Sequence, residues 1–168
     1  ALPEPHDKAA VQAELGIDAD VILAGTVSRI TAMKGIEDAI RAVARLTPDH
    51  LTLRYLVVGD GDALEGCRTL TEELGIKDRV IFAGYQKDVT RYLDAMDLFL
   101  FPSHKEALGV ALVEAMAESL PSVASNIDGI PEVLTPGTGL LVPVRDPEAD
   151  RKSTRLNSSH ANISYAVF

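Results

Sequence analysis

Short apolar segments alternate with amphipathic segments along most of the chain. Six apolar segments, rich in Val, Ile and Leu, are nearly continuous, which is typical of strands buried on both faces of a parallel sheet. They begin at Val21, Leu53, Val80, Leu98, Pro121 and Gly139. Segments with a helical period begin at Gly35, Ala63, Asp88 and Gly109. The pattern predicts an α/β domain with a Rossmann-like, doubly wound, mainly parallel six-stranded sheet and helices on both faces.

The carboxyl ends of the predicted strands are where we expect function, because open parallel sheets bind ligands there. The loops concerned follow Val27, Gly59, Tyr85, Pro102 and Ser125. In the loop after Ser125, Asp128 and Glu132 are interpreted as structural residues, with a short helix beginning near Pro131.

The composition narrows the classes of function. The 168 residues are 46% hydrophobic and carry a formal net charge of -9, which suits one globular domain. Nucleic-acid binding needs clustered Lys and Arg, so no nucleic-acid partner is expected. The single Cys67 can form neither an internal disulfide nor a zinc cluster, and no signal peptide or long apolar run is visible. A cytoplasmic location is therefore expected.

The two ends of the chain differ in composition from its centre. Residues 1–20 are interpreted as a linker and short helix that arrive from a missing N-terminal domain, and residues 21–149 as the Rossmann-like domain. Residues 150–168 are Ser-rich and have no acidic residue after Asp150. Their letters, DRKSTRLNSSH and ISYAVF around Ala161 and Asn162, resemble a translated short-read sequencing adapter with its barcode. We expect an artefactual tail there; the alternative is a genuine flexible basic tail.

Two cations and a glycine-rich turn follow the first two predicted strands. Arg29 and Lys34 bracket a turn before the helix at Gly35, where they could neutralise a diphosphate or be solvated surface cations. In the sequence GDGD, Gly59 and Gly61 lack the third glycine of a dinucleotide fingerprint. These two glycines indicate either a tight strand-to-helix turn or a close backbone approach to a ligand.

The sequence HKEALGVALVEAM places two glutamates around a helix that is predicted to begin at Gly109. The unpaired N–H groups of the helix start suit a phosphate or sugar oxygen. Glu114 is expected to be buried in the helix, where sugar hydroxyls would satisfy its carboxylate, while Glu106 lies in the loop above. The alternatives are a surface glutamate at 114 and a capping carboxylate at 106. His104 has no second histidine near it in sequence, so a metal site is not expected.

Taken together, these loops resemble the C-terminal, donor-binding domain of retaining "group 1" glycosyltransferases with the two-Rossmann (GT-B) architecture. The resemblance covers approximately residues 21–144 and rests on the motifs VSRITAMKG, VVGDG, VIFAGYQKDV, DLFLFPS, EALGVALVEAMA and SNIDGIPEVL. The Glu, seven residues, Glu signature is its most specific element. The chain departs from the usual pattern at Ala107 and Leu108, where glycine and an aromatic residue are common, and at Asp62, where proline is common.

The resemblance implies roles for individual residues. It implies a diphosphate clamp at Arg29 and Lys34, with Glu106 on the donor sugar and Glu114 on the ribose. The remaining donor- or nucleotide-binding positions are Gly61, then Gly84 and Tyr85 at the turn near the base, and the amides of Leu108, Gly109 and Val110 near the diphosphate and sugar. Neither a metal nor another cofactor is implied.

The function implied is transfer of a sugar from a UDP- or GDP-sugar with retention, by a full-length retaining hexosyltransferase. The acceptor, a sugar or glycolipid, would bind the missing N-terminal domain, so this fragment alone is expected to be inactive. The family's common setting is bacterial polysaccharide or glycolipid synthesis, with peripheral association at the inner face of the membrane. Two alternatives are a non-catalytic nucleotide-sugar binding module and a nucleotide-sugar epimerase of the GT-B fold.

Overall fold

A single parallel sheet forms the centre of the domain. The computed structural model describes residues 7–46, 52–135 and 137–144. Its strands are β1 (Ile22–Val27), β2 (Leu53–Val58), β3 (Val80–Gly84), β4 (Leu98–Phe101), β5 (Ser122–Ser125) and β6 (Gly139–Val142). They are ordered β3-β2-β1-β4-β5-β6, and every pairing is parallel. The predicted doubly wound α/β fold is confirmed.

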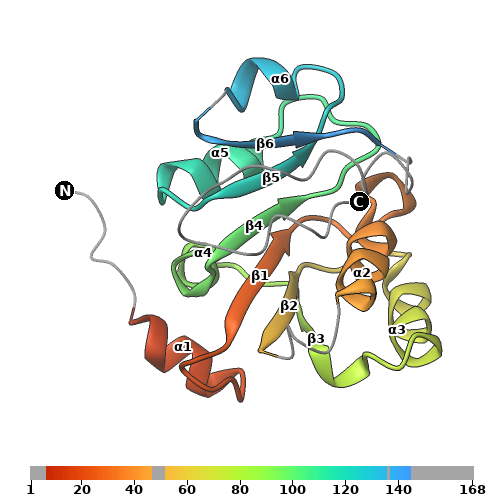
Figure 1. Ribbon diagram of the computed structural model, residues 1–168, viewed down its shortest axis with the longest axis vertical. Helices are drawn as coiled ribbons and strands as arrows, with labels where there is room; N and C mark the ends of the chain where they lie inside the picture. Colours follow the sequence, from red (N-terminus) through yellow and green to blue (C-terminus); the bar gives the residue numbers. More distant parts are fainter. Residues whose placement is uncertain (1–6, 47–51, 136, 145–168) are drawn as a thin grey trace.

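Helices cover both faces of this sheet (Figure 1). They are α1 (Lys8–Glu14), α2 (Ile36–Arg45), α3 (Leu64–Glu73), α4 (Thr90–Ala95), α5 (Val110–Ala117) and α6 (Ile130–Val133), with short 3-10 turns at Ala32–Lys34 and Lys77–Arg79. Within the described ranges, none of these helices has the length and apolar character that a bilayer crossing requires. The expected tail at 150–168 lies outside the described residues.

Two apolar cores lie on opposite faces of the sheet because neighbouring strand residues point in opposite directions. Tyr55 and Val57 pack with α2 and α3, whereas Leu56 and Val58 pack with α1, α4, α5 and α6. All four strand side chains are almost completely buried. This double burial explains why the strands read as continuous apolar runs.

The segment expected to be a linker contains α1, which packs on the domain itself. Val11 is buried in the same core as α4. Lys8 Nζ lies 2.5 Å from Asp97 Oδ1, and Arg91 pairs with Glu14. The helix is therefore an integral part of this face of the domain.

The order of the strands creates a switch point between β1 and β4. The chain first winds outward from β1 to the edge strand β3, and then returns to place β4 on the other side of β1. Connections on the two sides of this point diverge, so a crevice opens beyond the carboxyl ends of the central strands. The loops that follow β1, β2 and β4 meet there.

Candidate functional site

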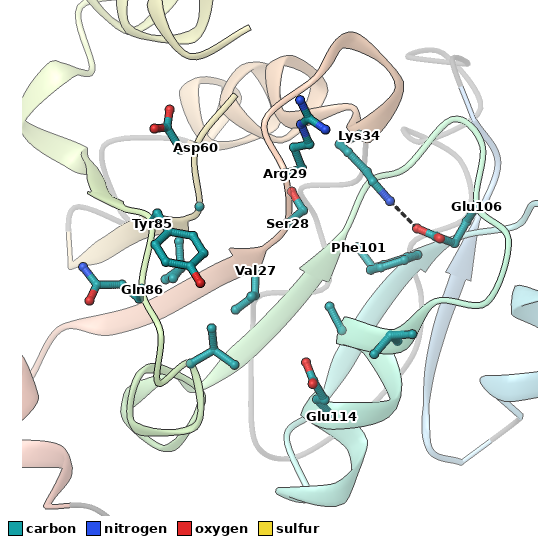
Figure 2. A pocket seen from close by; sticks show the side chains of 15 residues that line it. Val27, Ser28, Arg29, Lys34, Asp60, Tyr85, Gln86, Phe101, Glu106 and Glu114 are labelled. Carbon is teal, nitrogen blue, oxygen red and sulfur yellow. Dashed lines mark hydrogen bonds and ion pairs between the residues drawn. The ribbon is translucent and has the colours of Figure 1, made fainter. Parts of the chain in front are cut away.

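A cavity of about 590 Å³ lies beyond the carboxyl ends of the central strands (Figure 2). Its walls are the loops after β1, β2 and β3, the end of β4 with the loop that follows it, and the first turns of α5. It is lined by Val27, Ser28, Arg29, Lys34, Val58, Gly59, Asp60, Tyr85, Gln86, Val89, Phe101, Glu106, Val110, Ala111 and Glu114. The site thus lies where the sheet topology favours ligand binding.

Two glycines after β2 allow the loops of β1 and β2 to touch through their backbones. A β-carbon on Gly59 would lie 1.8 Å from the Ser28 carbonyl oxygen, and one on Gly61 would lie 2.1 Å from that of Ile30. The Ile30 N–H donates to the Asp60 carbonyl oxygen at 2.9 Å. The predicted strand-to-helix turn is present between β2 and α3, and the close backbone approach at these glycines is to the neighbouring loop of the protein.

A third glycine joins the loop of Lys34 to the loop of Glu106. Gly35 has a φ of +64°, and a β-carbon there would lie 1.9 Å from the Pro102 carbonyl oxygen. The His104 N–H donates to the Met33 carbonyl oxygen at 2.9 Å, and the His104 imidazole pairs with Asp38 in the first turn of α2. These contacts bring residues 34 and 106 together although they are 72 positions apart.

Lys34 and Glu106 form the central ion pair of the cavity. Lys34 Nζ lies 2.5 Å from Glu106 Oε2, and the two side chains are 26% and 14% exposed. The other carboxylate oxygen of Glu106 accepts the Ala107 N–H at 3.0 Å. Partial burial pushes the pKa of Glu106 upward, but the hydrogen bond and charge of Lys34 and backbone N–H groups outweigh it. The pKa of Glu106 therefore lies below its ordinary value, and the carboxylate is ionised at neutral pH.

Helix α5 begins at the cavity wall, as predicted. Gly109, with a φ of +62°, is its N-cap, and the helix begins at Val110. A β-carbon on Gly109 would lie 2.8 Å from Ile130 Cδ1, so glycine is needed for packing as well as for its backbone conformation. The first N–H groups of a helix have no partner within it, and Val110 and Ala111 in this first turn line the cavity.

Glu114 lines the cavity from α5, but the expectation that it is buried is wrong. Its side chain is exposed, as are the neighbouring Val110 and Val113. Figure 2 shows the Glu114 carboxylate below the cavity, across from Arg29 and Lys34. Val110 and Glu114 are exposed because they line the cavity, whereas the exposed Val113 lies outside its lining.

The other predicted site residues divide into two groups. Arg29 and Tyr85 line the cavity, and Tyr85 is 76% exposed. The residues outside the lining are Gly61, Gly84, Leu108 and Gly109. Gly61 and Gly109 allow close contacts to Ile30 and Ile130 that a side chain would block. The Gly84 carbonyl oxygen accepts the Gly59 N–H at 2.8 Å. Leu108 projects into solvent with 75% exposure.

Some residues of the cavity had no sequence signal as site residues. Ser28 precedes Arg29, and its hydroxyl is buried with no hydrogen-bond partner among the described residues. Gln86 lies in the lining and its amide donates to the Ala83 carbonyl oxygen at 2.7 Å. Position directly after a strand was the available signal for both Ser28 and Asp60. In the described part of the chain, no group of three or more His, Cys, Asp or Glu side chains is arranged to hold a metal ion.

Comparison with known proteins identifies the family to which this architecture belongs. The family described as "Glycosyl transferases group 1" matches residues 7–155. The chain belongs to the group 1 glycosyl transferases. It is 35% identical over 142 residues to N-acetyl-alpha-D-glucosaminyl L-malate synthase of Bacillus anthracis, covering 84% of this chain and 37% of that protein. It is 34% identical over 138 residues to the lipopolysaccharide core biosynthesis glycosyltransferase LpsE of Rhizobium meliloti, covering 82% and 39% of the two chains.

Solved glycosyltransferases of the GT-B type share the fold. Anabaena Alr3699/HepE, crystallised with UDP, matches with a TM-score of 0.78 and 28% identity over 86% of this chain and 40% of that one. WaaG, a glycosyltransferase involved in lipopolysaccharide biosynthesis, matches with a TM-score of 0.76 and 26% identity over 84% and 38%. The chain thus spans about two-fifths of the length of each of these proteins.

Proposed function

We propose that this chain is the donor-binding half of a retaining hexosyltransferase that transfers a sugar from a UDP- or GDP-sugar to an acceptor. The observation that carries the proposal is the convergence of Arg29, Lys34, Glu106 and Glu114 on one cavity. They come from two segments far apart in the sequence, 29–34 and 106–114, and the fold brings them together. The UDP bound by the related HepE supports a nucleotide donor here.

The arrangement of the lining suits the parts of such a donor in order. Figure 2 shows Tyr85 and Gln86 at one end of the cavity, Arg29 and Lys34 along one side, and Glu106 at the other end. We assign the base to the first end, the diphosphate to the cations and the donor sugar to Glu106. Glu114, across from the cations, accepts hydrogen bonds from the ribose hydroxyls.

The charges match the chemistry of transfer. When the bond between the anomeric carbon and the diphosphate oxygen breaks, the electron pair goes to that oxygen, so negative charge develops beside the cations. Arg29 offers a fork of donors and makes no hydrogen bond or ion pair within the described residues. Lys34 has three N–H donors, so it can hold Glu106 and a phosphate oxygen at once. The α5 N–H groups of Val110 and Ala111 add partial positive charge.

The acceptor site belongs to another domain in this proposal. The chain covers 37% and 39% of the two curated relatives, which leaves room for a second domain in the full-length protein. The acceptor, a sugar or glycolipid, would enter the cleft between the two domains at the inner face of the membrane. The described chain then binds the donor and does not turn it over.

Nuclear magnetic resonance titration of the 18.0 kDa chain tests the donor site directly. The probes are UDP, GDP, UDP-glucose, UDP-N-acetylglucosamine and GDP-mannose, and the amide signals of the cavity residues report binding. Lys34→Met should weaken nucleotide binding about tenfold to a hundredfold, since it removes a charge-assisted hydrogen bond. Lys77→Met is the matched control, because Lys77 precedes β3 and pairs with Glu72 at the opposite end of the sheet.

Two outcomes contradict the proposal. One is that no probe shifts the cavity signals at millimolar concentration. The other is that the variants at Lys34 and Lys77 bind equally well. In the full-length enzyme, Glu106→Gln should lower the rate of transfer sharply while the protein stays folded, and an unchanged rate would remove Glu106 from the site.

A further inference from the structure

Asp128 contacts the loop of Glu106 from outside the cavity. It lies in the turn between β5 and α6, and its Oδ2 accepts the backbone N–H of Glu106 at 2.8 Å. The carboxylate of Glu106 points the other way, to Lys34 and to its neighbour's N–H. Glu106 is therefore fixed at both ends, by Asp128 at the backbone and by Lys34 at the side chain.

The backbone of Asp128 argues that its carboxylate has a purpose. Its φ is +44°, in the left-handed region that glycine enters freely and that Asp and Asn tolerate better than other L-residues. The adjacent Gly129 has a φ of -85°, and no atom lies within 4 Å of a β-carbon built on it. Position 129 therefore does not require a glycine, whereas position 128 has a backbone conformation that suits glycine at least as well as aspartate. What aspartate adds at position 128 is its hydrogen bond to the Glu106 N–H.

The same turn also supports the far end of this loop. Ile130, at the start of α6, is buried and lies against the backbone of Gly109, the N-cap of α5. Asp128 therefore contacts the segment 106–109 at its first residue, and Ile130 contacts it at its last residue. Because α6 packs on the core of its own face, these contacts are anchored in the folded domain.

We infer that Asp128 is a positioning residue that holds Glu106 in the orientation needed to bind the donor sugar. The inference rests on the proposed function, since it assigns Asp128 a role only through Glu106. A positioning role has a specific consequence. Loss of the Asp128 hydrogen bond should weaken binding of a nucleotide sugar more than binding of the bare nucleotide, because in this proposal Glu106 contacts the sugar directly and the diphosphate only through Lys34.

Three variants separate this role from a purely structural one. Asp128→Gly removes the acceptor and relaxes the backbone, so the fold is retained. Asp128→Asn keeps an acceptor oxygen and a residue type that tolerates positive φ, so it should rescue the function. Glu132→Gln removes an exposed carboxylate from the adjacent helix α6 and is the matched control.

The measured quantity is the ratio of the dissociation constants of UDP-glucose and UDP, or of another nucleotide sugar and its nucleotide if that pair binds more tightly. Asp128→Gly should weaken nucleotide-sugar binding about threefold to tenfold, as expected for one net hydrogen bond, with a smaller effect on nucleotide binding. Asp128→Asn and Glu132→Gln should keep the wild-type ratio.

An unchanged ratio in Asp128→Gly, or equal weakening of nucleotide and nucleotide sugar, overturns the inference. Glu106→Gln, measured alongside, distinguishes this failure from failure of the proposed function. If Glu106→Gln alters the ratio and Asp128→Gly does not, only the role of Asp128 is lost. If the wild type and Glu106→Gln show the same ratio, the assignment of Glu106 to the sugar is wrong and the role of Asp128 falls with it.

Discussion

Replacement of Gly35 by alanine tests how the cavity is assembled. Gly35 connects Lys34 to α2 and has a φ of +64°. A β-carbon there would lie 1.9 Å from the carbonyl oxygen of Pro102, which begins the loop that carries Glu106. The added methyl group would therefore push apart the two loops that form the Lys34–Glu106 pair.

The loss of stability has two parts. A left-handed backbone costs an L-residue about 1–2 kcal/mol. The 1.9 Å approach is far inside normal contact distance, so the Pro102 backbone must move, and such overpacking costs about 1–3 kcal/mol more. For a domain of this size each 1 kcal/mol lowers Tm by about 2–4 °C, so Gly35→Ala should lower Tm by about 4–20 °C.

Gly75→Ala is the matched control for this experiment. Gly75 ends α3 with a φ of +67°, and nothing lies within 4 Å of its added β-carbon. It therefore reports the conformational part alone, a loss of about 2–8 °C by the same scale. Thermal unfolding of both variants, followed by circular dichroism, gives the difference. Equal Tm losses would refute the claim that the Gly35–Pro102 contact holds the two loops together.

Three further predictions concern ionisable groups. The pKa of Glu106 is lowered in the folded state, so its carboxylate stabilises the fold above the unfolded pKa, and this stabilisation is lost as pH falls through the folded pKa. Lys34→Met should raise the folded-state pKa of Glu106 in a carboxyl-carbon NMR titration. It should also reduce the loss of stability on acidification. Burial, and to a smaller extent the charge of nearby Glu37, raises the pKa of the Cys67 thiol to about 11. A thiol-specific chromogenic reagent should therefore react with Cys67 at neutral pH only after unfolding. Tyr55→Phe should cost about 0.5–1.5 kcal/mol in denaturant unfolding, because Thr26 Oγ1 loses the Tyr55 hydrogen bond at 2.8 Å while it still donates to the Leu100 carbonyl oxygen.

The strands could be predicted because double burial leaves a strong signal in the sequence. Each of the six begins within one residue of its predicted start. The helix expected at 109–120 ends earlier, at Ala117, because Ser119 takes a φ of +58° and returns Leu120 to the core. Apolar periodicity does not record such a local turn. Strand order likewise depends on crossovers that no local pattern specifies.

The site was harder to predict than the fold, for two physical reasons. Apolar residues that face a ligand cavity look like core residues in a sequence, so the exposed face of α5 around Glu114 was interpreted as buried. Glycines that permit contact between two loops look like glycines that permit contact with a ligand, as Gly59 and Gly61 illustrate. Both ambiguities are resolved only when the positions of neighbouring loops are known. The charged residues Arg29, Lys34 and Glu106 were accessible to prediction because each lies near the end of a readable strand.

Close backbone contacts at Gly35, Gly59 and Gly61 hold the loops around the cavity together, and we call these contacts the frame. The exposed side chains at the mouth of the cavity form its rim. The frame consists of backbone atoms that touch, so any side chain introduced there would disturb folding before it altered ligand preference. The rim carries Tyr85, which lines the cavity with 76% exposure, and the equally exposed Leu108 lies just outside the lining. Ligand choice can thus be redesigned, or can drift in evolution, through rim substitutions with little loss of stability. Under the proposed donor-binding function, foldability and selectivity are assigned to different residues of the same loops.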